Sequence, residues 1–483
     1  MTVVVVGAGP VGVTAALLLA RRGIDVLVLD RHAEAHPLPR AVHLDDESLR
    51  VLQAAGVADA FAAVSRPMAG LRLLDGGGRT LAEFPRGAGD HGWPQGSMFS
   101  QPDLEQVLRD ALAAEPRARL RGGVEVVRLD GAGPVRLTVR DRDTGAEEQL
   151  VADAVLGCDG ARSTVRGQIG ARMRDLGPGE RWLVVDLVAD TPLPVWPGVQ
   201  QVCDAVRPAT FMPVAGARYR AEFRLREHEA VADLDLDGLL GRFGAAGCTV
   251  VRSAEYRYAA QVADRWRQGR VLLNGDAAHL TPPFIGQGLG LGLRDAHQLA
   301  WKLAAVLDGA DDALLDTHQA ERAPHARSLV RLAVLLGRLM TGGGNRAALV
   351  RRGVLTGVRR VPRLAAFTAS SRTPPLRPGP QVRRPRFAPG SPVGSLLPQP
   401  PVEGPQRLDD VLGPDWAVVT AGGPVPPSWP GRVVRADELG SPELVRWLRG
   451  RSVLVRPDRI VAAVARRQRG WWRWDRPPNV SSR

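Results

Sequence analysis

The chain has 483 residues, 44% of them hydrophobic and 24% charged. This composition is typical of a globular protein of about two to four domains. No apolar run reaches the roughly 18 residues that a membrane helix needs, so we expect no membrane partner. The formal net charge is +13, but the basic residues are scattered arginines with one lysine, Lys302, and no nucleic-acid-binding motif accompanies them, so we expect no nucleic-acid partner.

Cysteine usage and the N-terminal residues bear on the compartment and on metal binding. Cys158, Cys203 and Cys248 are far apart and form no C-x-x-C pair, so neither a disulfide framework nor a metal site is expected. The first residues have neither the basic region nor the long apolar region of a signal peptide. We therefore expect a cytoplasmic protein.

The first predicted elements form a strand, a helix and a second strand. The β-branched run at residues 3–6 predicts a strand buried on both faces, and residues 14–22 predict a helix that ends at Gly23. Residues 26–29 predict a second buried strand, which ends in Asp30. This order is the context in which a dinucleotide-binding turn is found.

The turn between the first strand and the helix has the sequence Gly7-Ala8-Gly9-Pro10-Val11-Gly12. Gly7 permits the tight turn, Gly9 lets the backbone approach a pyrophosphate, and Gly12 lets the helix pack closely against the strand. The helix N-terminus favours phosphates, and Asp30 is placed to accept hydrogen bonds from a ribose. A glycine-rich turn without a ligand is the alternative, and the surrounding elements favour nucleotide binding without separating NAD from FAD.

Two further motifs follow along the chain. Residues 153–158 predict a strand that leads into the polar turn Asp159-Gly160-Ala161-Arg162, followed by a helix. Residues 270–274 predict another strand, which leads into the segment GDAAHLTPPFIGQG at 275–288 and then into a helix with apolar residues at helical spacing. An acid, two prolines and three glycines pack a core poorly, and they suit a backbone that comes close to a bound molecule.

In this order and at these separations, the three motifs resemble the class A flavoprotein monooxygenases, which are aromatic hydroxylases of the p-hydroxybenzoate hydroxylase type. Within that group, residues 39–47, 279–288 and 292–296 look most like 3-(3-hydroxyphenyl)propionate hydroxylases, and related polyketide and antibiotic hydroxylases share much of the pattern. The resemblance implies bound FAD, NADPH or NADH as co-substrate, and O2. It also implies a flavin C4a-hydroperoxide that hydroxylates a phenolic or polycyclic aromatic substrate.

The resemblance also implies cofactor contacts, residue by residue. Asp276 would hydrogen-bond the FAD ribityl chain, and Pro282 with Pro283 would lie beside the isoalloxazine ring. The backbone at Gly286–Gly288 would offer N–H groups to flavin N1 and O2, where reduced flavin carries negative charge. The complete predicted FAD set is Gly7, Gly9, Pro10, Gly12, Asp30, Arg31, Arg40, Gln101, Val126, Asp159, Gly160, Arg162, Gly275, Asp276, Pro282, Gly286, Gln287 and Gly288.

The substrate pocket is less well marked, and no catalytic base is assigned. The candidates for its wall are His43, Asp45, Phe211, Pro213, Tyr219 and Pro283. His43 and Asp45 have an alternative role as caps of the helix that begins near Asp45, and Phe211 and Tyr219 have one as core of a sheet. His279 is expected to brace its loop rather than to act in acid–base chemistry.

The predicted fold is α/β, with a Rossmann-like FAD-binding domain interleaved with a β-sheet substrate domain. The FAD-binding domain takes residues 1–70, 97–175 and 262–330, and the substrate domain takes 71–96 and 176–261. A helical segment at 331–372 and a Pro-rich linker at 373–405 follow. Residues 406–483 resemble the thioredoxin-like domain of larger family members but contain no cysteine, and we expect a monomer or homodimer.

Two alternatives stay open at this point, and a third is disfavoured. The same flavin chemistry supports Baeyer–Villiger-type oxygenation of an aromatic polyketide or antibiotic, and a non-catalytic flavoprotein would only bind an aromatic metabolite. A flavin-dependent halogenase needs a Gly-Trp-x-Trp-x-Ile-Pro motif and an essential lysine. Here the tryptophans at 471–474 miss that spacing, and Lys302 is expected to face solvent.

Overall fold

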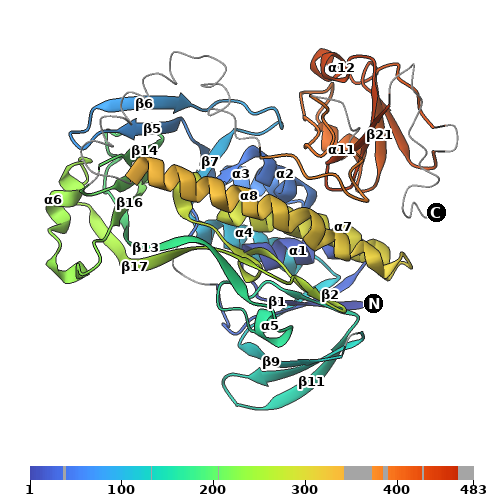
Figure 1. Ribbon diagram of the computed structural model, residues 1–483, viewed down its shortest axis with the longest axis horizontal. Coiled ribbons are helices and arrows are strands. Elements are labelled where there is room, and N and C mark those ends of the chain that lie inside the picture. Colours follow the sequence, from blue (N-terminus) through green and yellow to red (C-terminus); the bar gives the residue numbers. More distant parts are fainter. Residues whose placement is uncertain are drawn as a thin grey trace.

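The computed structural model describes residues 1–35, 40–131, 133–204, 206–341, 373–383, 390–426 and 429–465. Within these residues the chain forms two large sheets, a long pair of helices and a C-terminal unit (Figure 1). The mixed α/β class predicted from the sequence is confirmed. In the part of the chain that is described, no helix is long and apolar enough to cross a bilayer.

The nucleotide-binding sheet has six strands in the order β18-β19-β12-β1-β2-β8, and four of its five pairings are parallel. Its strands are β1 (Thr2–Val6), β2 (Asp25–Leu29), β8 (Ala118–Arg121), β12 (Ala154–Gly157), β18 (Arg267–Gln268) and β19 (Val271–Leu273). Val3 and Val5 pack on one face of this sheet, and Val4 and Val6 pack on the other. The unbroken valine run is therefore buried on both sides, as expected for a central parallel strand.

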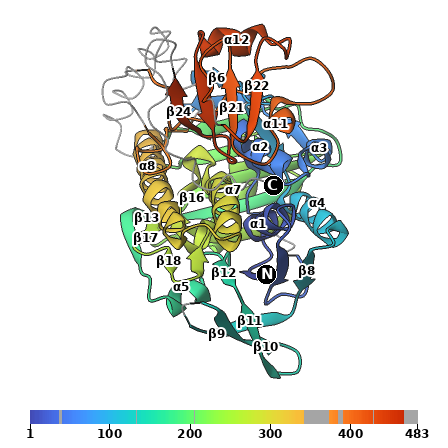
Figure 2. The ribbon, with the colours of Figure 1, turned by 90° about the vertical axis from the view of Figure 1, so that its right-hand side faces the viewer.

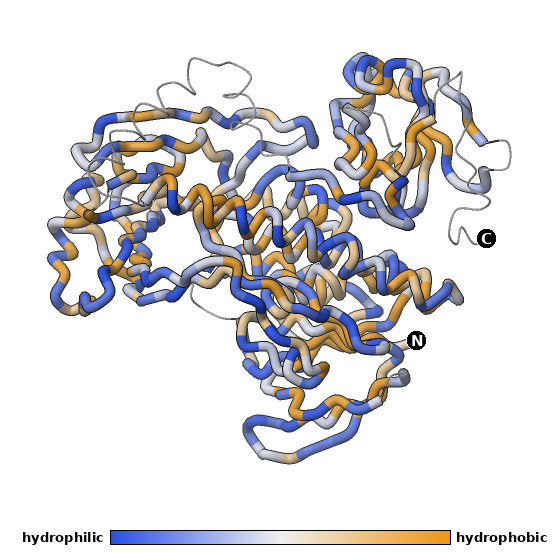
Figure 3. The backbone as a smooth tube through the Cα atoms, viewed as in Figure 1, coloured by the Kyte–Doolittle hydropathy of each residue, from blue (hydrophilic) through white to orange (hydrophobic). Residues whose placement is uncertain are grey.

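Helices cover one face of this sheet, and a three-stranded meander lies against the other. The helices on and around the first face are α1 (Pro10–Ala20), α2 (Asp46–Ala54), α3 (Ala58–Ala63), α4 (Gln101–Ala114) and α7 (Gly288–Leu307). The second core contains residues of β9 (Val124–Asp130), β10 (Val135–Asp141), α5 (Thr164–Gln168) and α8 (Asp316–Thr341), and β11 (Glu147–Ala152) completes the meander. Figure 3 shows hydrophobic and hydrophilic residues alternating along the helices, and the outer end of the meander mostly hydrophilic.

The second large sheet has eight strands in the order β20-β17-β13-β16-β15-β14-β5-β6. Its strands are β5 (Gly70–Leu74), β6 (Thr80–Pro85), β13 (Met173–Val188), β14 (Val199–Val202), β15 (Ala209–Pro213), β16 (Arg218–Arg224), β17 (Thr249–Ala263) and β20 (His279–Leu280). The helix α6 (Leu236–Gly241) and Phe243 pack on its back face. A small sheet of β3 (His43–Asp45), β7 (Gly96–Phe99) and β4 (Ser65–Pro67) also forms.

The C-terminal unit has a mixed four-stranded sheet in the order β22-β21-β23-β24. Its strands are β21 (Ala417–Thr420), β22 (Arg432–Arg435), β23 (Ser452–Val455) and β24 (Val461–Ala465), and its helices are α11 (Leu408–Leu412) and α12 (Pro442–Leu448). Figures 1 and 2 place this unit at the opposite end of the molecule from the meander. Its thioredoxin-like character and the domain limits above stay predictions.

Buried ion pairs connect the C-terminal unit to the rest of the chain. Arg50 on α2 donates two hydrogen bonds to the Asp409 carboxylate, at 2.8 and 2.6 Å. Arg456 donates to Glu321 on α8 at 2.8 Å, and the same Glu321 oxygen accepts from Lys302 at 3.0 Å. The expectation that Lys302 faces solvent is therefore wrong, because Glu321 supplies a buried counter-charge to a fully buried ammonium group.

Candidate active site

One large cavity connects the nucleotide-binding sheet to the front face of the eight-stranded sheet. It has a volume of about 1790 Å³, whereas a site for one small ligand usually has roughly 300–1,000 Å³. The carboxyl ends of β1 and β2, the segment before α7, and residues of β13, β15, β16 and β17 all contribute to its wall. The cavity therefore has room for a cofactor and a substrate together.

The turn after β1 has the geometry of a phosphate-binding turn. Gly7 has φ 107° and lies so close to Cys158 that a Cβ would meet the Cys158 carbonyl oxygen at 2.4 Å. A Cβ on Gly12 would lie 1.9 Å from the Gly7 carbonyl oxygen, whereas one on Gly9 would meet nothing within 4 Å. Gly7 and Gly12 are thus required by packing, and Gly9 leaves its backbone open to the cavity, as close approach of a pyrophosphate requires.

The N-terminus of α1 adds a site for negative charge. The helix begins after Gly9 with Pro10 in its first turn, and neither a side-chain cap nor an acidic residue occupies that turn. Its first N–H groups and the positive end of its dipole therefore remain available to phosphate oxygens. The Asp30 carboxylate accepts hydrogen bonds from the N–H groups of Ala8 at 2.6 Å and His32 at 2.8 Å, which fixes the turn beside the expected ribose position.

The backbone of Arg40 is held at the cavity by hydrogen bonds from two neighbouring elements. The Gln101 side-chain oxygen accepts the N–H groups of Arg40 at 3.1 Å and Ala41 at 2.7 Å. The Arg40 carbonyl in turn accepts a hydrogen bond from Arg220 of the eight-stranded sheet at 2.6 Å. These bonds connect the cofactor end of the cavity to its substrate end.

The segment before α7 forms the other half of the cofactor site. Residues Pro283–Ile285 form a 3-10 turn, and Gly286 follows in the left-handed region with φ 61°. α7 then begins at Gly288 with no side-chain cap and no acid in its first turn. Gly286, Gln287 and Gly288 all line the cavity, so this uncapped helix start suits the negative charge that a reduced flavin ring carries.

Asp276 offers a hydrogen-bonding group between the two helix starts. Its side chain lines the cavity, and none of the residues that the structure describes forms a hydrogen bond or ion pair with its carboxylate. Burial raises the pKa of Asp276, while His279 and Arg40 lower it. A carboxylate so placed fits the hydroxyl groups of a ribityl chain, which would donate hydrogen bonds to it.

Asp159 has a local structural role at the second motif. Its carboxylate accepts hydrogen bonds from the Ser163 hydroxyl at 2.5 Å and the Val165 N–H at 3.0 Å, so it holds the start of α5. Burial raises the pKa of Asp159. Arg166 donates to the carbonyls of Ala161 at 2.8 Å and Ala277 at 3.1 Å, which joins this motif to the segment containing Asp276.

Most of the predicted cofactor residues lie together on the cavity wall. The ones that line it are Gly7, Gly9, Pro10, Asp30, Arg31, Arg40, Gln101, Val126, Asp159, Gly160, Arg162, Asp276, Gly286, Gln287 and Gly288. Gly12, Gly275 and Pro282 lie behind the wall, and Pro283 rather than Pro282 reaches the cavity. The glycine turn, the two uncapped helix starts and the unpaired Asp276 carboxylate together fit FAD, and these residues would hold it.

Only part of the predicted substrate pocket lies on the cavity wall. His43, Asp45 and Pro283 line it, but Phe211, Pro213 and Tyr219 do not. Phe211 and Tyr219 stack with ring centroids 6.0 Å apart in the core behind the sheet, where Phe211 also stacks on Phe243. The alternative assignment of Phe211 and Tyr219 to the sheet core therefore matches their positions, because the alternation of β15 and β16 turns these side chains to the back.

The same alternation brings polar residues to the front face, and these residues were not predicted from the sequence. Asp186 lies opposite Arg220 on β16 and opposite Arg252 on β17. Arg220 donates to Asp186 at 2.8 Å, and Arg252 lies 3.7 Å from the second oxygen of that carboxylate. Polar residues at every second position of β16 were the available signal, but the sequence does not say which face meets the cofactor.

Asp45 and His279 brace the segments around the flavin site. Asp45 caps α2 by accepting from the Ser48 N–H at 2.8 Å, and its other oxygen accepts from Gln287 at 2.7 Å and Arg294 at 2.6 Å. These partners lower the pKa of the buried Asp45 carboxyl, with Arg294 the largest contributor after burial, which acts in the opposite direction. His279 is fully buried and contacts Asp295 at 2.6 Å, in keeping with its expected bracing role.

The comparisons with known proteins agree with this geometry. The FAD binding domain family matches residues 1–333, which is more than half of the chain. A 3-(3-hydroxy-phenyl)propionate/3-hydroxycinnamic acid hydroxylase from Mycobacterium sp. (strain KMS) is 35% identical over 431 residues, covering 86% of this chain and 74% of the relative. A probable NADH-specific resorcinol 4-hydroxylase from Rhodococcus jostii (strain RHA1) is 34% identical over 432 residues, covering 87% and 79%.

A solved structure extends the likeness to the C-terminal unit. The ternary complex of aklavinone-11 hydroxylase with FAD and aklavinone superposes with a TM-score of 0.76 at 26% identity, covering 96% of this chain and 95% of that one. The family match, the relatives and this structure together confirm the FAD cofactor and the monooxygenase class predicted from the three motifs. The chain belongs to the FAD-dependent aromatic hydroxylases.

Proposed function

We propose that the chain hydroxylates a phenolic or polycyclic aromatic compound with NADH or NADPH and O2. The observation that carries the proposal is a cavity whose wall contains most of the predicted FAD-binding residues and also the front of the eight-stranded sheet. Bound FAD would accept a hydride from the nicotinamide and activate O2. The relatives that act on hydroxyphenylpropionate and resorcinol, and the structural neighbour that holds aklavinone, support an aromatic substrate.

In this proposal the chain's own residues bind and orient the two molecules and keep water out. Asp276 and the backbone of 286–288 would hold the flavin, and the turn at Gly7–Gly12 would hold the pyrophosphate. Apolar side chains that include Trp182, Val184 and Met212 line the substrate end. An apolar surface suits a flat ring and limits unproductive loss of the activated oxygen to water.

Three finer points also belong to the proposal. We propose a cytoplasmic location, where reduced nicotinamide is supplied, and a monomer or homodimer. Baeyer–Villiger-type oxygenation uses the same cavity and remains the second reaction to test. Lys302 does not line the cavity, since its ammonium group is paired with Glu321, and this position disfavours the lysine-dependent halogenase chemistry.

A panel of phenols tests the proposal. The purified protein should carry FAD, and at least one phenol should accelerate NADH or NADPH oxidation and yield a product that is heavier by one oxygen atom. A lactone or ester product would instead identify Baeyer–Villiger insertion. Bound aromatic compounds without any oxygenated product would identify a flavoprotein that only binds them.

A further inference from the structure

Glu222 is a buried acid that faces the substrate end of the cavity without a partner. It lies on β16 with only 7% of its surface exposed, and it lines the cavity. Within the described ranges, its carboxyl forms neither a hydrogen bond nor an ion pair. By contrast, Glu229 near the same sheet is paired with Arg207, and Glu255 with Arg181.

The neighbours of Glu222 are committed to other contacts. Across the sheet it lies opposite Val184 on β13 and Thr210 on β15. The Thr210 hydroxyl donates to the Gln201 side-chain oxygen at 2.8 Å, and Gln201 donates to backbone carbonyls, one of them that of Ala209 at 3.0 Å. Arg220, two residues before Glu222, donates to Asp186 and to the Arg40 carbonyl.

An unpartnered carboxyl at this position is costly to the folded protein. An ionised acid without a donor loses its hydration and gains nothing in return, at a cost of several kcal/mol. Burial raises the pKa of Glu222, with Arg220 opposing this shift and Asp186 adding to it. Such a group is expected where a ligand brings the missing hydrogen-bond donor.

The surroundings of Glu222 indicate which donor fits. Trp182, Val184 and Met212 give the wall apolar and aromatic surface suited to a flat ring. Burial and the Glu222 carboxyl raise the pKa of the nearby Tyr258, so its hydroxyl stays neutral. A second carboxylate beside Glu222 would be repelled, whereas a hydroxyl group on an aromatic ring supplies one donor in the plane of the ring.

We propose, on the basis of the hydroxylase function above, that Glu222 binds the phenolic hydroxyl of the substrate and accepts its proton. The phenolic O–H bond breaks, and a new O–H bond forms at a Glu222 carboxylate oxygen. The electron pair stays on the phenolic oxygen, where it enriches the ring carbons that are to be oxygenated. Glu222 is thus a catalytic base and the group that selects hydroxylated rings.

The acid–base step has a defined set of charged neighbours. The charges that act directly on Glu222 are those of Arg220 on β16 and Asp186 on β13. On β17, Tyr258 interacts with Glu222, and Arg252 lies beside Asp186. A base with a raised pKa takes a phenolic proton more readily than an ordinary carboxylate does. The rate should therefore fall on acidification as Glu222 becomes protonated.

The FAD-loaded full-length protein and its Glu222→Gln variant test the inference with resorcinol and 1,3-dimethoxybenzene as probes. The amide keeps the size of the side chain but cannot accept the proton. We expect Glu222→Gln to weaken resorcinol binding about tenfold and to lower kcat/KM at least about 100-fold. The acidic limb of the pH profile should disappear, while FAD content and dimethoxybenzene binding, both followed by flavin absorbance, stay unchanged. Glu147→Gln changes an exposed glutamate on β11 and serves as the matched control.

A second measurement needs no turnover and no variant other than the one above. p-Nitrophenol bound to the unaltered protein below its own pKa should show the absorbance of its phenolate, and this band should be absent in Glu222→Gln. Equal weakening of resorcinol and dimethoxybenzene binding by Glu222→Gln would indicate a structural role and overturn the inference.

Unchanged resorcinol binding with an unchanged pH profile would also overturn the inference. So would failure of both resorcinol and p-nitrophenol to bind the unaltered protein. Phenols bound through Glu222 but never oxygenated would overturn the proposed hydroxylation and support the Glu222 assignment.

Discussion

At the scale of single residues, the site depends on carboxylates that differ in how many hydrogen bonds they accept from the protein. Asp45 is fully paired and braces two helix starts, Asp159 accepts from the first turn of α5, and Asp276 faces the cavity without a partner among the described residues. A paired acid stabilises the fold, whereas an acid that faces the cavity without a protein partner can accept hydrogen bonds from a ligand. Substitutions at these residues should therefore have different consequences.

Asp276→Ala should reduce FAD retention and leave the fold intact. The variant removes hydrogen bonds that the Asp276 carboxylate would accept from the ribityl hydroxyls, worth about 1.5–3 kcal/mol, which corresponds to a roughly 10–150-fold weaker FAD affinity. The ratio of flavin to protein absorbance after gel filtration measures this loss. Asp143→Ala, which changes an exposed turn, should retain FAD like the unaltered protein, and equal retention by both variants would contradict the role of Asp276.

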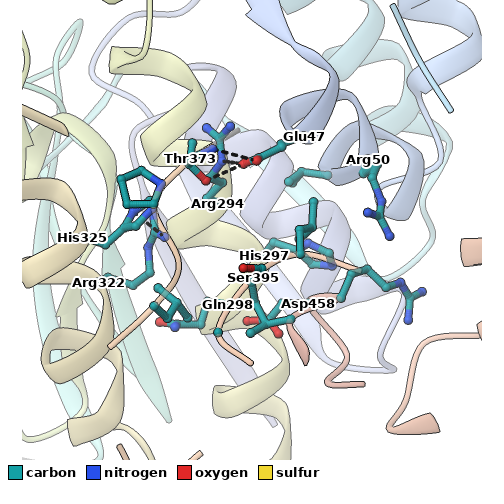
Figure 4. A pocket seen from close by; sticks show the side chains of 17 residues that line it. Glu47, Arg50, Arg294, His297, Gln298, Arg322, His325, Thr373, Ser395 and Asp458 are labelled. Carbon is teal, nitrogen blue, oxygen red and sulfur yellow. Dashed lines mark hydrogen bonds and ion pairs between the residues drawn. The ribbon is translucent and has the colours of Figure 1, made fainter. Parts of the chain in front are cut away.

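At the scale of elements, the start of α7 is positioned by bonds from α2 rather than by its own cap. Asp45 connects the two through Gln287 and Arg294, and Glu47 also accepts from Arg294 at 3.0 Å. Figure 4 shows Glu47, Arg294 and Thr373 converging beside a second, small cavity. The geometry of the flavin loop thus depends on a residue far from it in the sequence.

Asp45→Ala should destabilise the protein more than loss of an ordinary helix cap. It removes the cap of α2, worth about 1 kcal/mol, and leaves the buried Arg294 with one partner fewer, for a total of about 3 kcal/mol. Urea unfolding of the FAD-free protein measures the change. The control is Asp235→Ala on α6, whose carboxylate caps Gly238 alone at 2.9 Å in an exposed position and should cost only about 1 kcal/mol. Similar losses in both variants would show that the contacts to Gln287 and Arg294 contribute little.

The elements also show what the sequence can and cannot predict. The strand–turn–helix around Gly7–Gly12 and the segment at 275–288 were predictable, because glycine spacing and apolar runs dictate local backbone structure. The side chains that meet the substrate were not, because a strand's alternation leaves open which face meets the cavity. Phe211 and Tyr219 therefore turned out to lie in the core, and Glu222 on the wall. Lys302 was misjudged because its partner Glu321 comes from another helix.

At the scale of the whole molecule, the C-terminal unit is held by charges that are buried in its interface with α2, α7 and α8. His297 on α7 lies in this interface, among the residues that line the small cavity in Figure 4. Asp458, Arg459, Arg22 and Asp409 surround it. Burial lowers the pKa of His297 to about 4, with the two acids opposing this shift.

This position of His297 predicts a loss of stability between about pH 6.5 and 4. In that range the unfolded chain binds a proton at His297 and the folded chain does not, so stability falls as the pH falls, by about 2 kcal/mol at pH 5. His297→Gln should reduce the difference in Tm between pH 7 and pH 5, because glutamine does not titrate. His228→Gln alters an exposed histidine and should keep the full difference. An unchanged pH dependence in His297→Gln would contradict the buried neutral state.

The central claim is that one cavity brings FAD and an aromatic ring together for oxygen transfer. Turnover of the FAD-loaded protein under 18O2 with NADH or NADPH and the phenol that most accelerates its oxidation tests this claim most directly. We predict a hydroxylated product that carries one 18O atom, formed in proportion to the nicotinamide consumed. Nicotinamide oxidation that yields only hydrogen peroxide with every phenol, or a product whose new oxygen comes from water, would contradict the account.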